Sequence, residues 1–120
     1  MDRRIFHIKN KLSQDLGRSW SVEDMADHCR FSASHFRRLF KEEVGITPAA
    51  YLNNLRLEKV REMLADPDCF LQTKEIGVLV GLTNESHFTH DFKAKFGMTP
   101  TAYRAHQAEI HQLKSLNESE

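Results

Sequence analysis

Apolar residues recur along the chain at the three- and four-residue spacing of amphipathic α-helices, and strand-like alternation is nearly absent. The pattern predicts a first helix over residues 3–16, which Gly17 ends. A short second helix follows Ser21, an expected N-cap with Asp24 in the capping-box position, and a third helix follows Ser32. The apolar positions that form the inward faces of these helices are Ile5, Ile8, Leu12, Leu16, Val22, Met25, Ala26, Cys29, Phe36, Leu39, Phe40 and Val44.

The third helix is expected to end at Gly45, because glycine readily adopts the left-handed conformation of a helix C-cap. Thr47 and Pro48 then start a new helix, since threonine is a good N-cap and proline at the first helical position loses no hydrogen bond. Ile46 and Tyr51 are spaced to form a hydrophobic staple. The apolar residues of this long helix do not keep to one stripe, which is expected of a helix that contacts two separate bodies.

The same order of elements then occurs a second time. Thr73 is the expected N-cap of a short helix, Gly81 lies in the following turn, and Asn84 caps the next helix. This copy has its own apolar stripe, glycine stop, Thr-Pro restart and staple, formed by Phe88, Phe92, Phe96, Gly97, Thr99, Pro100, Met98 and Tyr103. Residues 34–51 and 86–103 share 10 identities in 18 at an offset of 52, and the two turns differ by one residue.

A short helix, a tight turn and a second amphipathic helix form the helix-turn-helix pattern. Its second helix, the recognition or reading helix, can lie in a DNA major groove. We therefore expect an all-α fold with two helix-turn-helix subdomains, residues 1–47 and 67–107, joined by a long linker helix over residues 48–66. A linker of roughly 27 Å can hold two reading helices about one DNA turn, roughly 34 Å, apart. Residues 108–120 form a polar tail that we expect to fray.

Composition excludes some classes of function. The formal net charge is zero, which is unusual for a nucleic-acid-binding protein. The N-terminal half is nevertheless basic and the C-terminal half acidic. Residues 1–65 carry 12 Lys or Arg against 9 Asp or Glu, and residues 66–120 carry 5 against 8. No apolar run approaches the roughly 18 residues of a membrane span. Two cysteines are too few for a disulfide framework, so we expect a reduced, cytoplasmic setting without membrane contact.

Two stretches carry a family resemblance: SVEDMADHCRFSASHFRRLFKEEVGITPAAYLNNLRLEKVREML and KEIGVLVGLTNESHFTHDFKAKFGMTPTAYR. Together they resemble the DNA-binding domain of the AraC/XylS family of bacterial transcription regulators, over about residues 5–106. The most specific stretch is GLTNESHFTHDFKAKFGMTPTAYR, which matches the family signature over the second unit. The resemblance implies seven helices, with two helix-turn-helix units joined by a long fourth helix.

The resemblance also implies sequence-specific binding of double-stranded DNA and regulation of bacterial transcription, as an activator at the nucleoid that contacts RNA polymerase. It implies no cofactor. Many members of the family carry a separate sensing or dimerisation domain ahead of this one. We therefore expect a fragment of a longer regulator, with a small stand-alone regulator as the alternative.

Four polar side chains of the first reading helix face outward: Ser34, Arg37, Arg38 and Lys41. These positions match the surface with which the family contacts DNA, and we assign the first three to bases and Lys41 to phosphate. Arginine can form two hydrogen bonds to guanine O6 and N7, which contributes about 1–3 kcal/mol of discrimination. The alternative for the Arg37 and Arg38 pair is a solvated charged face.

The outward residues of the second reading helix, all expected to contact bases, are Glu85, Ser86, His87, Thr89 and His90. Glu85 either accepts a hydrogen bond from cytosine N4 or simply caps the helix. His90 can donate to a base or a phosphate, and Thr89 can contact a thymine methyl group or a phosphate. Because this helix lacks an arginine, base reading and simple gripping of the DNA backbone both stay open.

Phosphate is expected to bind at helix N-termini and at nearby basic groups. Besides Lys41, the expected contacts are Thr47, Ala49, Lys93, Lys95, Thr99 and Arg104. The Thr-Pro pairs also act as ordinary helix caps, and both roles can hold at once.

Other side-chain groups predict little chemistry. His87 and His90 have the spacing of a zinc pair, but no third ligand lies close by, so we expect no metal. Cys29 lies on an inward stripe, which favours a small buried side chain over a nucleophile. Gly77 is expected to permit close helix packing. With no general acid/base pair or nucleophile motif, we expect no enzyme. The main alternative to DNA binding is a helical protein-interaction module whose grooves bind partner helices.

Overall fold

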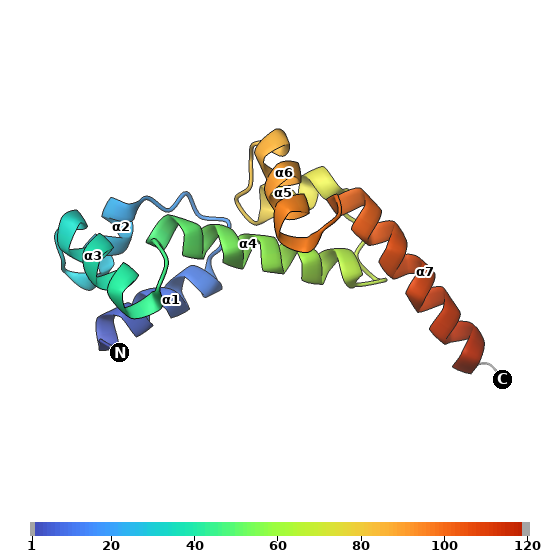
Figure 1. The fold of residues 1–120 in the computed structure, drawn as a ribbon, viewed down its shortest axis with the longest axis horizontal. Coiled ribbons are helices and arrows are strands. Elements are labelled where there is room, and N and C mark those ends of the chain that lie inside the picture. Colours follow the sequence, from blue (N-terminus) through green and yellow to red (C-terminus); the bar gives the residue numbers. More distant parts are fainter. Residues whose placement is uncertain (1, 119–120) are drawn as a thin grey trace. The chain divides into compact units, whose positions relative to one another are not determined.

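The computed structural model describes residues 2–118 and forms seven α-helices, without a strand, over that range (Figure 1). In chain order the helices are α1 (Arg3–Gln14), α2 (Val22–Cys29), α3 (Ala33–Val44), α4 (Pro48–Ala65), α5 (Thr73–Leu79), α6 (Glu85–Phe96) and α7 (Pro100–Glu118). The all-α prediction is confirmed, as is the number of helices that the resemblance implies. Within the described range, no helix has the length and apolar content needed to cross a membrane.

The chain divides into two compact units, unit 1 (Met1–Arg56) and unit 2 (Leu57–Glu120), and the boundary falls inside α4. Each unit has its own buried core. Unit 1 buries Ile5, Ile8, Leu12, Met25, Ala26, Cys29, Phe36, Phe40 and Leu52. Unit 2 buries Leu57, Val60, Leu64, Ile76, Val80, Phe88 and Phe92. Because α4 supplies Leu52 to one core and three residues to the other, its apolar positions cannot follow a single stripe.

Side chains cap the helices of unit 1 as the sequence predicts. Ser21 Oγ accepts the backbone N–H of Asp24 at 3.0 Å, and the Asp24 carboxylate accepts the N–H of Ser21 at 3.3 Å, which completes the capping box. Ser32 Oγ accepts the N–H of His35 at 3.2 Å and starts α3. Gly45 ends α3 with φ of 92°. These local contacts fix where α2 and α3 begin and where α3 ends.

The caps of unit 2 agree with the sequence at α6 and differ at α5. Asn84 Oδ1 accepts the N–H of His87 at 3.0 Å, and Gly97 ends α6 with φ of 86°. The predicted N-cap Thr73 is wrong, because Thr73 is the first residue of α5 and Gln72 is the cap. The backbone N–H of Gln72 donates to the Glu75 carboxylate at 3.2 Å, so the N-cap is the polar residue one position before Thr73.

The turns of the two helix-turn-helix units share one hydrogen-bonded core and differ by one inserted residue. In unit 1 the N–H of Phe31 donates to the carbonyl of Ala26 at 3.0 Å, after Arg30 in the left-handed region with φ of 59°. In unit 2 the N–H of Leu82 donates to the carbonyl of Gly77 at 2.7 Å, after a left-handed Gly81. The offset is 51 up to this point and 52 afterwards, so the extra residue lies between Leu82 and the α6 cap.

An arginine in each unit holds the loop that precedes the short helix. Arg56 of α4 donates to the carbonyls of Leu16 and Arg18 at 2.9 and 2.8 Å. Arg104 of α7 donates to the carbonyls of Leu71 and Cys69 at 2.6 and 3.0 Å. Burial lowers the pKa of the Arg56 guanidinium, which nevertheless keeps its charge. Both units therefore use the same device, from the helix that follows the reading helix.

The chain ends differ from the expectation. At the C-terminal end α7 continues as a helix through residues 108–118 of the expected polar tail, residues 119–120 lie outside the described range, and the fraying of this tail stays a prediction. At the other end, α1 stops at Gln14, two residues before the predicted limit, and Leu16 is half-buried against the core of unit 1.

Candidate nucleic-acid interface

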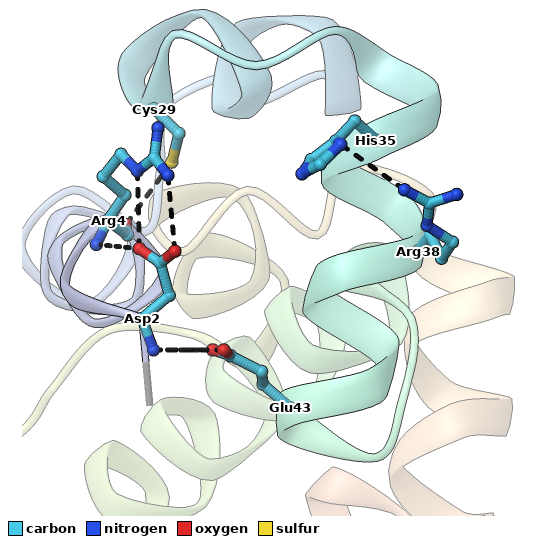
Figure 2. A network of polar contacts seen from close by, with 6 residues as sticks. All are labelled: Asp2, Arg4, Cys29, His35, Arg38 and Glu43. Carbon is cyan, nitrogen blue, oxygen red and sulfur yellow. Dashed lines mark hydrogen bonds and ion pairs between the residues drawn. The ribbon is translucent and has the colours of Figure 1, made fainter.

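The reading helix of unit 1, α3, is linked to the start of α1 through the side chain of Glu43, near the C-terminal end of α3 (Figure 2). The backbone N–H of Asp2 donates to both carboxylate oxygens of Glu43, at 3.0 and 3.1 Å. The Asp2 carboxylate caps α1 by accepting the N–H of Arg4 at 2.8 Å, and this bond lowers the pKa of Asp2. The Arg4 guanidinium lies 4.1 Å from the centre of the Phe31 ring, in the turn before α3. These contacts connect α1 to both ends of α3.

On its outward side α3 borders a hollow of about 590 Å³, which we call the unit 1 groove. Its lining is formed by Val22, Ser34, Arg37, Arg38, Lys41, Thr47, Pro48 and Ala49. All six DNA contacts that the sequence assigns to this unit line the groove, three of them are cations, and no carboxylate is among the lining residues. The structure therefore brings the outward face of α3 together with the N-terminus of α4.

The arginines of the unit 1 groove are held only by exposed contacts. Arg37 lies 3.4 Å from the carboxylate of Glu23 on α2, and both side chains are more than half exposed. Arg38 lies 3.5 Å from Nδ1 of His35, one turn earlier on α3 (Figure 2). An exposed ion pair contributes about 0–1 kcal/mol, so a DNA phosphate or base can displace these partners at low cost.

In unit 2 the five residues predicted to contact bases lie at the N-terminal half of α6. All are exposed except Thr89, which is half-buried. His90 is 82 % exposed and its Nδ1 lies 3.5 Å from the carboxylate of Asp91. Lys93, one turn later, is exposed and equivalent to Lys41. The outward face of α6 therefore offers the Glu85 carboxylate, hydroxyl groups, imidazoles and one lysine where α3 offers three cations.

Two of the predicted phosphate contacts are engaged inside unit 2. Lys95 Nζ lies 3.8 Å from the carboxylate of Glu58 on α4 and 5.7 Å from the ring centre of Phe96. The Arg104 guanidinium is taken up by two loop carbonyls, as described above. A phosphate role for either residue stays a prediction, and both side chains already have a structural use.

The threonines of the two restarts act as caps. Thr47 Oγ1 accepts the N–H of Ala50, and Thr99 Oγ1 accepts the N–H of Ala102, each at 3.2 Å. Because these bonds use only one of the first amide groups of α4 and α7, the caps are compatible with phosphate binding at the same helix ends.

Sequence reasoning missed the residues that touch α3 from other elements. Val22 and Pro48 line the unit 1 groove, and Glu23 of α2 contacts Arg37. Each helix was interpreted by its own periodicity, which does not show which face of α2 lies beside α3. The cap at Ser21 was the available signal, since it places Glu23 in the first turn of α2, at the end that borders α3.

Among the described residues, no three His, Cys, Asp or Glu side chains gather as potential metal ligands. His87 and His90 are both exposed on α6. Cys29 is buried in the core of unit 1, and burial raises the pKa of its thiol. The groups of this site that can bind a partner are therefore its cations, its hydroxyl groups and its helix ends.

Comparison with known proteins matches residues 25–106 to a helix-turn-helix domain family. The transcriptional regulator MtrA of Neisseria gonorrhoeae is 32% identical over 104 residues, which are 86% of this chain and 34% of that protein. The regulator AlkR of Acinetobacter baylyi is 38% identical over 85 residues, 71% of this chain and 27% of that protein. A solved AraC-type regulator from Chromobacterium violaceum superposes with a TM-score of 0.78 at 25% identity, covering 88% of this chain and 93% of that one. This chain belongs to the AraC/XylS family of transcription regulators.

Members of the AraC/XylS family are DNA-binding regulators of transcription and do not form a class of enzymes. The fold is also that of the DNA-binding domain of AdpA, solved with a target DNA, with a TM-score of 0.79 at 22% identity over 85% of this chain and 90% of that one. The chain spans about a third of the length of the curated relatives it matches, with shares of 27–38% for the AlkR, MtrA and LumQ regulators.

Proposed function

We propose that the chain binds double-stranded DNA sequence-specifically, with α3 and α6 in two adjacent major-groove segments of one asymmetric site. The observation that carries this proposal is the unit 1 groove, where Arg37, Arg38 and Lys41 line one hollow together with the N-terminus of α4. Two arginines reach base edges from a helix that fits the major groove, and the helix end beside them binds phosphate.

The roles within unit 1 follow from the chemistry of each group. Arg37 and Arg38 form paired hydrogen bonds to guanine O6 and N7, after releasing Glu23 and His35. Ser34 contacts a base at the start of α3. Lys41, Thr47 and the backbone of Ala49 hold the phosphates on one side of the groove.

In unit 2 we propose weaker base reading and a larger share of backbone contacts. Glu85, Ser86, His87, Thr89 and His90 face the bases, and Lys93 and Thr99 hold phosphates. Lys95 and Arg104 are left out of this set, because Glu58 and the loop carbonyls already engage them. Hydroxyl groups and imidazoles add less than lysine and arginine to the affinity that comes from neutralised phosphates.

The test uses a DNA site selected from random sequences by the unaltered chain. Replacing Arg37 and Arg38 by Ala is expected to reduce specific affinity by about 100-fold or more, since each bidentate pair contributes about 1–3 kcal/mol. Gel retardation at several salt concentrations measures this change. The matched control, Arg3→Ala with Lys11→Ala, removes the same charge from exposed positions of α1. Unchanged specific affinity in the Arg37 and Arg38 variant, or an equal loss in the control, contradicts the proposal.

We further propose that the chain activates transcription at the bacterial nucleoid by contacting RNA polymerase through unit 2, in a protein that also carries a sensing or dimerisation domain. A specific observation favours a protein contact: Phe70, Leu71, Val78 and Leu79 are exposed apolar residues, and the last three line a hollow of about 420 Å³ on α5. In vitro transcription tests this. Val78→Ser with Leu79→Gln is expected to keep DNA affinity and lose activation, and full activation contradicts the contact.

A further inference from the structure

The last three turns of α7 (Figure 1) lie outside the family match, which ends at residue 106. Their side chains form two unlike faces. One face borders a hollow of about 540 Å³ beside the end of α4 and the loop after it; from α7 its lining comprises Arg104, Gln107, Ala108, His111, Gln112 and Ser115. The other face carries Ile110, Leu113 and Leu116, which are 36, 62 and 60 % exposed. The larger apolar side chains of this segment therefore lie away from its own unit.

The exposed face has the spacing of a coiled-coil seam. His106, Ile110, Leu113 and Asn117 follow one another at intervals of four, three and four residues, which are the a and d positions of a heptad. Ile110 occupies an a position and Leu113 a d position, the combination that favours two parallel strands. Asn117 falls at the next a position, where asparagine sets register and favours a dimer.

The charges beside this seam are complementary to those of a second copy. In the same register Glu109 is a g residue and Lys114 is the following e residue, five positions later. Two parallel copies place Glu109 of each beside Lys114 of the other, which gives two opposite-charge pairs. An antiparallel pair would place like residues together and repel, so the charges favour the parallel arrangement.

We propose that the C-terminal part of α7 is a self-association surface, which pairs in parallel with the same segment of a second copy of this chain. The seam spans fewer than two heptads, so the area that it buries is small. Stable specific complexes bury at least about 1,200 Å², and the association is therefore weak in solution. It strengthens when DNA or another domain holds two copies close together, because the local concentration then rises. The surface does not use the unit 1 groove, so self-association and DNA binding can fail separately.

Sedimentation equilibrium of the whole chain tests the apolar part, at concentrations up to about 1 mM because a small interface binds weakly. The expected result is a monomer–dimer equilibrium. Leu113→Gln is expected to weaken it by about tenfold or more, because each dimer loses two buried leucines. Phe6→Gln, a similarly exposed apolar residue on α1, is the matched control and is expected to change nothing. A chain that is monomeric at every concentration, or an equal loss in both variants, overturns the proposal.

A charge exchange tests the partner and its orientation. Glu109→Lys alone and Lys114→Glu alone are each expected to weaken the dimer, because every copy then meets like charges. An equimolar mixture of the two variants is expected to recover the association, because positions 109 and 114 are then both positive in one copy and both negative in the other. The double variant is expected to recover it as well. Absence of recovery in the mixture overturns the parallel second copy as the occupant of this face.

Discussion

Three outward positions of α3 carry arginine or lysine, whereas only one of the equivalent positions of α6 does; the pairs are Arg37 and Thr89, Arg38 and His90, and Lys41 and Lys93. The units as a whole follow the same trend. Unit 1 holds ten Lys or Arg against seven Asp or Glu, and unit 2 holds seven against ten. In the interior, by contrast, equivalent aromatic rings of the two units pack at similar distances. In unit 1 the ring centres of Phe36 and Phe40 lie 5.6 Å apart, and those of Phe40 and Tyr51 lie 5.4 Å apart.

The equivalent rings of unit 2, Phe88, Phe92 and Tyr103, are separated by 6.3 and 5.8 Å. The arginines that hold the preceding loops also match in their targets, two carbonyls separated by one residue. The repeat therefore preserves the support of a reading helix and leaves its outward residues free to differ. Sequence specificity is expected to depend on those differing residues, and on unit 1 most strongly.

The largest effect is expected from removing one aromatic ring from each core. Phe40→Ala and Phe92→Ala each delete a fully buried ring and are expected to cost about 3–5 kcal/mol of unfolding free energy. Because each unit has its own core, each variant is expected to lose hydrogen-exchange protection mainly in its own unit. Loss of protection throughout the chain in either variant would show that the two cores unfold together.

A smaller effect is expected from the two loop-holding arginines. Arg56→Met and Arg104→Met each remove two charge-assisted hydrogen bonds, and we expect a loss of about 1–3 kcal/mol from each. Urea unfolding measures the change. Arg61→Met is the matched control, because Arg61 makes a half-exposed pair with Glu58 and a contact with Phe96, worth about 1 kcal/mol, in place of bonds to a loop. If Arg104→Met costs no more than the control, the guanidinium is available for phosphate after all.

The smallest effect is expected at the turn. A Cβ on Gly77 would lie 3.2 Å from the carbonyl oxygen of Leu82 and 3.3 Å from the Phe88 ring, whereas Ala26 fills the same place in unit 1. Gly77→Ala is expected to destabilise unit 2 by up to about 1 kcal/mol, since crowding outweighs the gain in helix propensity. Thermal unfolding checks this, with Ala26→Gly as the reciprocal change. A stabilised Gly77→Ala variant would mean that the turn of unit 2 has room to spare.

The elements that could be predicted from the sequence are those set by contacts within a few residues. Ser21 and Asn84 as caps, Gly45 and Gly97 as stops, and the buried phenylalanines follow from local hydrogen bonds and periodicity. Gly77 also has the predicted packing role. The error at Thr73 is a choice between two adjacent polar residues, both able to precede a helix.

Contacts between distant segments could not be predicted. The bonds of Arg104 to the loop carbonyls span 33 and 35 residues, and nothing in the spacing of α7 indicates them. Arg30 adopts a left-handed conformation that local sequence usually assigns to glycine. The tail was interpreted by its polar composition, although Ile110 and Leu113 already have helical spacing. Four residues of the unit 1 groove, Ser34, Arg37, Arg38 and Lys41, could be predicted because they lie on the outward face of one helix, α3.

Methylation protection of guanine N7 on the selected DNA site tests the central claim most directly, because this atom lies in the major groove and is the one that arginine binds. The unaltered chain is expected to protect guanines in two adjacent major-groove segments. Arg37→Ala with Arg38→Ala is expected to abolish protection in one segment and leave the other in place. Protection that persists in both segments would contradict the assignment of α3 as the principal reading helix.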